Sequence, residues 1–214
     1  MLKKRDAQIV FQSMYCAIGI IGIIASTGFF EYDFTPNFPI YFTNLGNYFC
    51  IGVMFAALVQ TLKKKEDSYV TINPFAKFIG VMSLLLTGIV YNVMLAPTYD
   101  PIENFQPNSV ILHIILPIMF VADWFLFYEA KKLKWYYPLL TVISPIGYVI
   151  FIYIRAAILG FDTTNHLLYP YFFLDLDTQG VAGVAKWIAL LALAFIIMSY
   201  IFFGIDRLRA KKEK

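Results

Sequence analysis

The stretch NSVILHIILPIMFVADWFLFY, residues 108–128, decides the fold of this chain. Its length is that of a helix that crosses a lipid bilayer, which takes about 20 apolar residues. Two ionisable side chains, His113 and Asp123, interrupt the apolar run, and such groups at membrane depth are costly enough to indicate a function. Pro117 follows His113 by one helical turn. Because proline has no N–H to bond the His113 carbonyl, we predict a break in the helix at this point.

The composition of the whole chain is typical of a membrane protein. Of its 214 residues, 60% are hydrophobic and 14% are charged, whereas soluble domains average about 45–50% and about 25%. The mean hydropathy is +0.68. The two cysteines, Cys16 and Cys50, lie in apolar runs, which indicates packing residues rather than a disulfide framework. We therefore predict an integral membrane protein.

Six apolar runs separated by polar connections predict a single all-α domain, a polytopic six-helix transmembrane bundle. The predicted spans are residues 8–30, 41–62, 74–96, 108–128, 137–159 and 181–204. All Lys and Arg residues except Arg155 and Lys186 fall at the two termini or near the 2–3 and 4–5 connections, and the other connections carry acidic residues instead. The positive-inside rule then places both termini in the cytoplasm. It also accounts for the basic clusters, so we expect no nucleic-acid partner.

Polar side chains of five different spans fall at one depth, in the outer half of the predicted bundle. Their depth follows from their distance to the span ends at about 1.5 Å per residue. Polar residues in spans usually face the bundle interior or a wet cavity, so we expect these side chains to converge. The layer contains Thr43, Asn47, Asn92, His113, Arg155 and Lys186.

Helical periodicity refines this layer. Thr43, Gly46, Asn47 and Cys50 share one face of the second span, and Ser144, Tyr148 and Arg155 share one face of the fifth. Asp123 lies about 15 Å deeper than His113 and is turned away from it by about 80°. We therefore expect Asp123 to have a structural role, such as pairing with a lysine near the inner surface, and not to orient His113.

The residue types of the layer are those of an ester hydrolase. A hydroxyl nucleophile needs a base within hydrogen-bond reach and a donor for the oxyanion that develops. Thr43 and His113 supply the first pair, and the candidate substrate- or oxyanion-binding residues are Asn47, Asn92, Tyr148, Arg155 and Lys186. An outer-leaflet site favours a lipid ester that enters from the membrane, under a cap formed by the aromatic loop 169–173. No metal-ligand spacing or phosphate-binding loop is present, so we expect neither metal nor cofactor.

Structural interpretations of the same residues stay open. A threonine in a span most often bonds a carbonyl one turn back. Histidine and asparagine commonly connect helices, and Arg155 and Lys186 can extend to the membrane surface. One alternative is therefore a lipid- or small-molecule-binding or transport protein, in which Arg155 holds a carboxylate. Another is an accessory protein in which the polar layer only joins helices. The sequence does not define the oligomeric state.

Four short motifs resemble those of a known family. They are YFTNLGN at 41–47, LHIILP at 112–117 with Asp123 and Trp124, the pairs Tyr137-Pro138 and Gly147-Tyr148, and YPYF at 169–172. In this order they resemble the androgen-induced-protein family of multipass membrane threonine hydrolases, especially its bacterial six-helix branch. The resemblance implies six helices with cytoplasmic termini in the plasma membrane, the inner membrane of bacteria. It also implies a Thr43–His113 pair that hydrolyses fatty-acid esters of hydroxy fatty acids.

Overall fold

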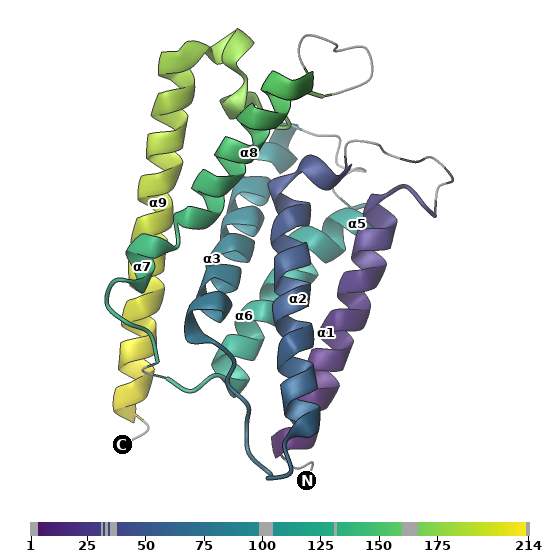
Figure 1. Cartoon of the computed structure of the whole chain (residues 1–214), viewed down its shortest axis with the longest axis vertical. Helices are drawn as coiled ribbons and strands as arrows, with labels where there is room; N and C mark the ends of the chain where they lie inside the picture. Colours follow the sequence, from purple (N-terminus) through teal and green to yellow (C-terminus); the bar gives the residue numbers. More distant parts are fainter. Residues whose placement is uncertain are drawn as a thin grey trace.

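Six helices, each long and apolar enough to cross a membrane, form the molecule (Figure 1). The computed structural model describes residues 4–30, 32, 34, 38–98, 105–130, 132–159 and 167–212, and within these ranges all regular secondary structure is helical. The predicted all-α, six-helix class is confirmed.

The six spans are built from straight helices and from helices with a local break. Two are uninterrupted, α1 at Lys4–Ser26 and α2 at Phe42–Lys63. The third is α3, Pro74–Val90, continued by a π-helical turn at Tyr91–Leu95. The fourth is α5, Pro107–Val110, a π-helical turn at Ile111–Ile115, and α6, Leu116–Phe127. The fifth is α7, Tyr137–Leu140, and α8, Ile143–Leu159; the sixth is α9, Leu176–Lys212.

The second to fifth spans lie within one residue of their predicted limits at each end, and the first and sixth do not. The first helix ends at Ser26 rather than at residue 30. Gly28, with a φ of 76°, turns the chain away there. The sixth begins at Leu176, bends at Gly180 (φ 63°, ψ 169°) and continues to Lys212 rather than 204. The apolar run predicts where a helix crosses the bilayer, but not how far it continues into the polar region.

Both termini lie at the same end of the bundle (Figure 1), which we call the proximal end; the opposite end is the distal end. The connections after α2 and α6 are proximal, and those after α1, α3 and α8 are distal. Aromatic and aliphatic side chains of α1, α2, α3, α6 and α9 form the main core, including Tyr15, Phe78, Phe120, Trp124 and Phe195. Many isoleucine, leucine and phenylalanine side chains point outward, as lipid-facing residues do.

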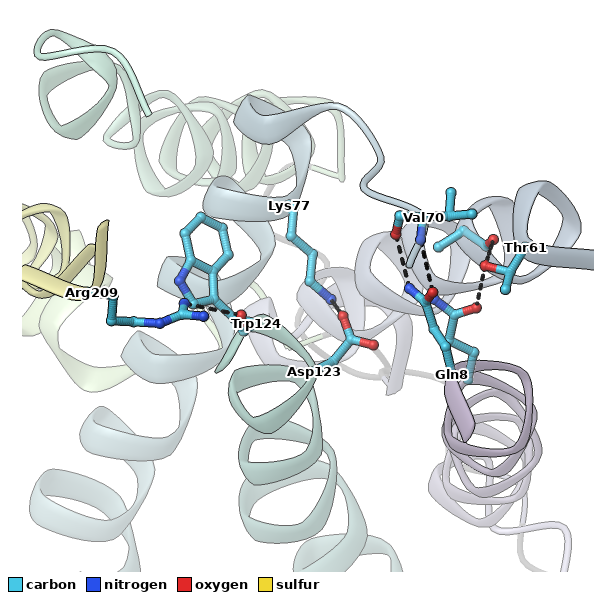
Figure 2. Close-up of polar contacts among 9 residues, drawn as sticks. Gln8, Thr61, Val70, Lys77, Asp123, Trp124 and Arg209 are labelled. Carbon is cyan, nitrogen blue, oxygen red and sulfur yellow. Dashed lines mark hydrogen bonds and ion pairs between the residues drawn. The ribbon is translucent and has the colours of Figure 1, made fainter. Parts of the chain in front are cut away.

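A buried ion pair joins α3 to α6 near the proximal end (Figure 2). The Lys77 ammonium lies 2.5 Å from the Asp123 carboxylate, and the two side chains are 3% and 7% exposed. Lys77 also sits 3.6 Å from the centre of the Phe120 ring, a cation–π geometry. The structural role predicted for Asp123, pairing with a lysine near one surface, is confirmed.

Polar contacts also hold the proximal connections in place (Figure 2). The Gln8 amide makes two hydrogen bonds with the backbone of Val70, donating at 2.8 Å and accepting at 2.9 Å. Thr61 donates to Gln12 at 3.0 Å, which joins α2 to α1. Arg209 of α9 donates to the carbonyls of Trp124, Phe125 and Tyr128, groups that have no partner within their own helix end. The proximal half is therefore fixed by its own polar contacts.

Breaking the buried ion pair tests its structural role. Asp123→Ala leaves the Lys77 charge buried without a partner, so we expect a loss of about 3–5 kcal/mol in unfolding free energy. The double variant Lys77→Met/Asp123→Leu removes both charges and should recover most of that loss. Unfolding of the purified proteins in detergent measures both effects. Equal destabilisation of the single and double variants would show that the charge pair is not the cause.

Candidate active site

Thr43 and His113 meet in the distal half of the bundle. Thr43 is the second residue of α2, and His113 is the middle residue of the π-helical turn of the fourth span. The threonine Oγ1 lies 3.2 Å from Nε2 of the histidine. Thr43 is 9% exposed, so the contact is largely shielded. The face predicted from helical spacing, Thr43, Gly46, Asn47 and Cys50, is buried throughout.

The second ring nitrogen of His113 sets the tautomer. Nδ1 lies 3.0 Å from the carbonyl oxygen of Ser109, one turn earlier. A carbonyl can only accept, so Nδ1 must carry the proton, and in the neutral ring Nε2 is then the unprotonated acceptor. The Thr43 hydroxyl is therefore the donor in the contact with Nε2. This is the order of groups, nucleophile to base to orienting acceptor, that activates a hydroxyl.

The Tyr91 ring fixes the imidazole from the side. The two rings stack with centroids 3.6 Å apart and planes at 11°. The Tyr91 hydroxyl is 2.6 Å from the Ser109 hydroxyl, which in turn lies 3.4 Å from Nδ1 of His113. The histidine is thus held in position by a ring face and by the neighbouring turn of its own helix.

Two π-helical turns bring these residues together. In each, the backbone bond spans five residues instead of four: Ala96 N–H donates to the Tyr91 carbonyl, and Leu116 N–H donates to the Ile111 carbonyl. Proline is the next residue in both cases, Pro97 and Pro117. Because proline has no N–H for the carbonyl four residues earlier, it disturbs the α-helical pattern locally. The break predicted at Pro117 therefore takes the form of a π-helical turn, a feature often found at functional sites.

Asn47 connects the two helices that carry the pair. It is fully buried, and its amide nitrogen donates to the carbonyls of Thr43 at 2.8 Å and Leu112 at 3.3 Å. The same side chain therefore bonds the nucleophile's residue and the residue before His113. Its N–H groups point at carbonyls, so Asn47 positions the pair in this structure, and its role as an oxyanion donor stays a prediction.

The other predicted site residues lie at the distal end but on different faces. The Tyr148 ring borders the cavity at Thr43, and its hydroxyl donates to the Ile40 carbonyl at 3.0 Å. Asn92 is exposed and donates to Gly88 of its own helix at 2.7 Å. Arg155 donates to the Leu167 carbonyl at 2.7 Å, and Lys186 is exposed on α9. The structure thus brings Thr43, Asn47, His113 and Tyr148 together and leaves Asn92, Arg155 and Lys186 apart from them.

An apolar cavity of about 140 Å³ adjoins Thr43. Residues of α3, α8 and α9 form most of its wall, and Tyr171, Phe173 and Leu174 of the loop before α9 cover it. The predicted aromatic cap is confirmed in this respect. The wall includes Leu86, Val90, Leu95, Ile146, Val149, Ile188, Leu191 and Ala192. Such a wall suits a hydrocarbon chain, with Thr43 beside it as a polar group that could meet an ester.

Three residues of the site were not among the predicted ones: Tyr91, Ser109 and Tyr171. Ser109 acts through its backbone carbonyl, for which a sequence has no side-chain signal. The spacing of Ser109 to His113, one helical turn, is the only indication of their contact. Tyr171 belongs to the aromatic loop that was predicted as a cap, but its contact with the start of α2 spans 129 positions.

Removing the Asn47 side chain tests whether it holds the pair together. Asn47→Ala leaves two buried carbonyls without their donor, so we expect a loss of about 1–2 kcal/mol in unfolding free energy. Unfolding in detergent measures this loss. Asn92→Ala, which removes an exposed amide bonded only within its own helix, serves as the matched control and should lose less than about 0.5 kcal/mol. Similar stability of the two variants would contradict the bridging role.

Comparison with known proteins gives no relative to set beside this geometry: no family model, no curated protein and no solved structure matches the chain.

Proposed function

We propose that the chain is an intramembrane threonine hydrolase that cleaves lipid-like esters. One observation carries the proposal: Thr43 Oγ1 donates to Nε2 of His113, whose Nδ1 is bonded to the Ser109 carbonyl. A threonine with a packing role needs no base, and a packing histidine needs no hydroxyl aligned with its free lone pair. The apolar cavity beside Thr43 adds a place for the hydrocarbon part of a substrate.

The arrangement supports a two-step acyl transfer to water. Thr43 Oγ1 attacks the ester carbonyl carbon while its proton passes to Nε2 of His113. The bond from that carbon to the alcohol oxygen breaks, and His113 returns the proton to the leaving alcohol. Water then attacks the acyl-threonine, giving one proton to His113, which passes it to Thr43 as the carboxylic acid leaves. The Ser109 carbonyl stabilises the protonated ring in both steps.

The proposal includes a location and an orientation. The clusters Lys63, Lys64 and Lys65, Lys131 and Lys132, and Arg207 and Arg209 belong to the termini and connections of the proximal end. With this end in the cytoplasm, the site occupies the outer half of a plasma membrane, the inner membrane if the source is bacterial. A lipid ester then reaches Thr43 from the bilayer. Fatty-acid esters of hydroxy fatty acids are the substrates that the family resemblance suggests.

A lipid-binding protein without catalysis is the second candidate. The almost wholly apolar wall of the cavity favours it, because such a wall holds a hydrocarbon chain with or without chemistry at Thr43. A carboxylate held by Arg155 has less support, since this guanidinium donates to the carbonyls of Leu167 and Leu168. The two candidates differ in whether Thr43 becomes covalently modified.

Labelling with a fluorophosphonate separates these candidates. We expect the purified protein to be labelled and to hydrolyse members of a panel of fatty-acid esters. Thr43→Ala should abolish the labelling, and Thr43→Ala and His113→Ala should each lower hydrolysis by about 10³-fold or more. Thr61→Ala, which removes another buried hydroxyl of α2 near the proximal end, is the control and should keep both activities. Labelling that survives Thr43→Ala would refute the nucleophile assignment, and a folded protein inert to every ester would favour the binding function.

Filling the cavity tests whether it holds the acyl chain. Ala192→Phe places a ring in its wall, so hydrolysis of long-chain esters should fall while that of acetate esters stays unchanged. Each methylene group that loses its place costs about 0.8 kcal/mol, or roughly a factor of four in kcat/KM. Ala194→Phe, on the exposed side of the same helix, is the matched control. Equal effects on short and long esters would place the chain elsewhere.

A further inference from the structure

An ester hydrolase needs a hydrogen-bond donor at the carbonyl oxygen, where negative charge develops as the nucleophile attacks. Among the predicted donors, Asn47 gives its N–H groups to two carbonyls. Asn92 and Arg155 donate to backbone carbonyls away from the cavity at Thr43. The position of the donor is therefore open, and the part of the chain that covers the cavity has a candidate, Tyr171.

The Tyr171 hydroxyl lies at the start of α2, beside the nucleophile. Tyr171 is 8% exposed, and its oxygen accepts the backbone N–H of Phe42 at 3.1 Å. The first N–H groups of a helix have no partner within the helix, and Tyr41, which precedes α2, makes no side-chain cap. The phenol thus takes the place of a cap, and it does so next to Thr43, with which it shares the wall of the cavity.

The phenol remains a donor at neutral pH. Burial raises the pKa of Tyr171 to about 12, and the nearby Thr43 and Phe42 groups oppose this rise. The neighbouring hydroxyls of Thr43 and Tyr148 already donate, to His113 and to the Ile40 carbonyl. They can offer the Tyr171 proton only a neutral oxygen, whereas an oxyanion beside Thr43 would be a much stronger acceptor.

The loop that carries Tyr171 is held firmly enough to place this proton. The Tyr171 ring stacks on Phe173 with centroids 5.1 Å apart and planes at 5°. Tyr153 of α8 donates to the Leu174 carbonyl at 2.9 Å, and Arg155 donates to the Leu167 carbonyl at 2.7 Å. Both ends of the segment 167–174 are therefore bonded to α8. Arg155, predicted as a binding residue, supports the donor through this contact.

We propose that Tyr171 donates the hydrogen bond that stabilises the oxyanion formed when Thr43 attacks an ester. The phenol oxygen accepts the Phe42 N–H, and this bond polarises its own O–H toward the carbonyl oxygen of the substrate. This inference rests on the proposed hydrolase function, and it adds a catalytic residue that lies 128 positions after the nucleophile in the chain.

The test compares Tyr171→Phe with the wild type on a fatty-acid ester that the wild type hydrolyses. Loss of one oxyanion donor should lower kcat by about 10²–10³-fold and leave KM nearly unchanged. The variant should lose affinity for a trifluoromethyl ketone, which forms a tetrahedral adduct with Thr43, by a similar factor. Its affinity for the corresponding ether, which forms no adduct, should stay the same. Tyr153→Phe removes a phenol bonded to the same loop and should keep kcat within a few-fold.

The ether and the wild type separate the other outcomes. Equal loss of affinity for ether and ketone would show that Tyr171 only supports the cavity, and an unchanged kcat would also overturn the inference. If Tyr171→Phe does not fold, 3-fluorotyrosine at position 171 keeps the ring and acceptor but makes the O–H more acidic. A changed kcat with unchanged ether affinity then supports the donor role, and an unchanged kcat overturns it. A wild type that hydrolyses no ester contradicts the hydrolase function itself.

Discussion

The hydrogen bond from Nδ1 of His113 to the Ser109 carbonyl determines what the distal half of this bundle can do. It leaves Nε2 unprotonated and aimed at the Thr43 hydroxyl. Inside an apolar bundle, backbone carbonyls must find donors within the protein, and local departures from the α-helical pattern change which donors they find. The π-helical turns before Pro97 and Pro117 are such departures, and they present Tyr91 and His113 to each other as a stacked pair.

The two ends of the bundle have different tasks. The proximal half contains the Lys77–Asp123 pair, the Gln8–Val70 bonds and the contacts of Arg209, all of which join helices or connections. The distal half has a cavity, irregular helical turns and a loop folded over the start of α2. Stability that comes from the proximal half allows the distal half to keep a partly open, polar site. This division explains why the two ionisable residues of the fourth span, His113 and Asp123, have unrelated roles.

Much of this could be predicted from the sequence, because depth in a bilayer follows from position along a helix. The spans, the shared level of Thr43 and His113 and the separate place of Asp123 all depend on depth. The direction in which a side chain points depends on helix rotation, and an extra residue in a π-helical turn rotates the remainder of the helix by about 100°. Asn92 therefore faces outward although its neighbour Tyr91 is buried. Contacts such as that of Tyr171 with Phe42 depend on the path of a loop, which no periodicity reveals.

The covalent state of Thr43 during turnover tests the account most directly. The protein can be mixed with a long-chain ester, quenched in acid within milliseconds to seconds, digested and analysed by mass spectrometry. The account predicts that the acyl mass is found on Thr43, and that it appears and decays at rates consistent with hydrolysis. Hydrolysis with the acyl group on another residue, or a folded protein that is never acylated and cleaves no ester, would contradict it.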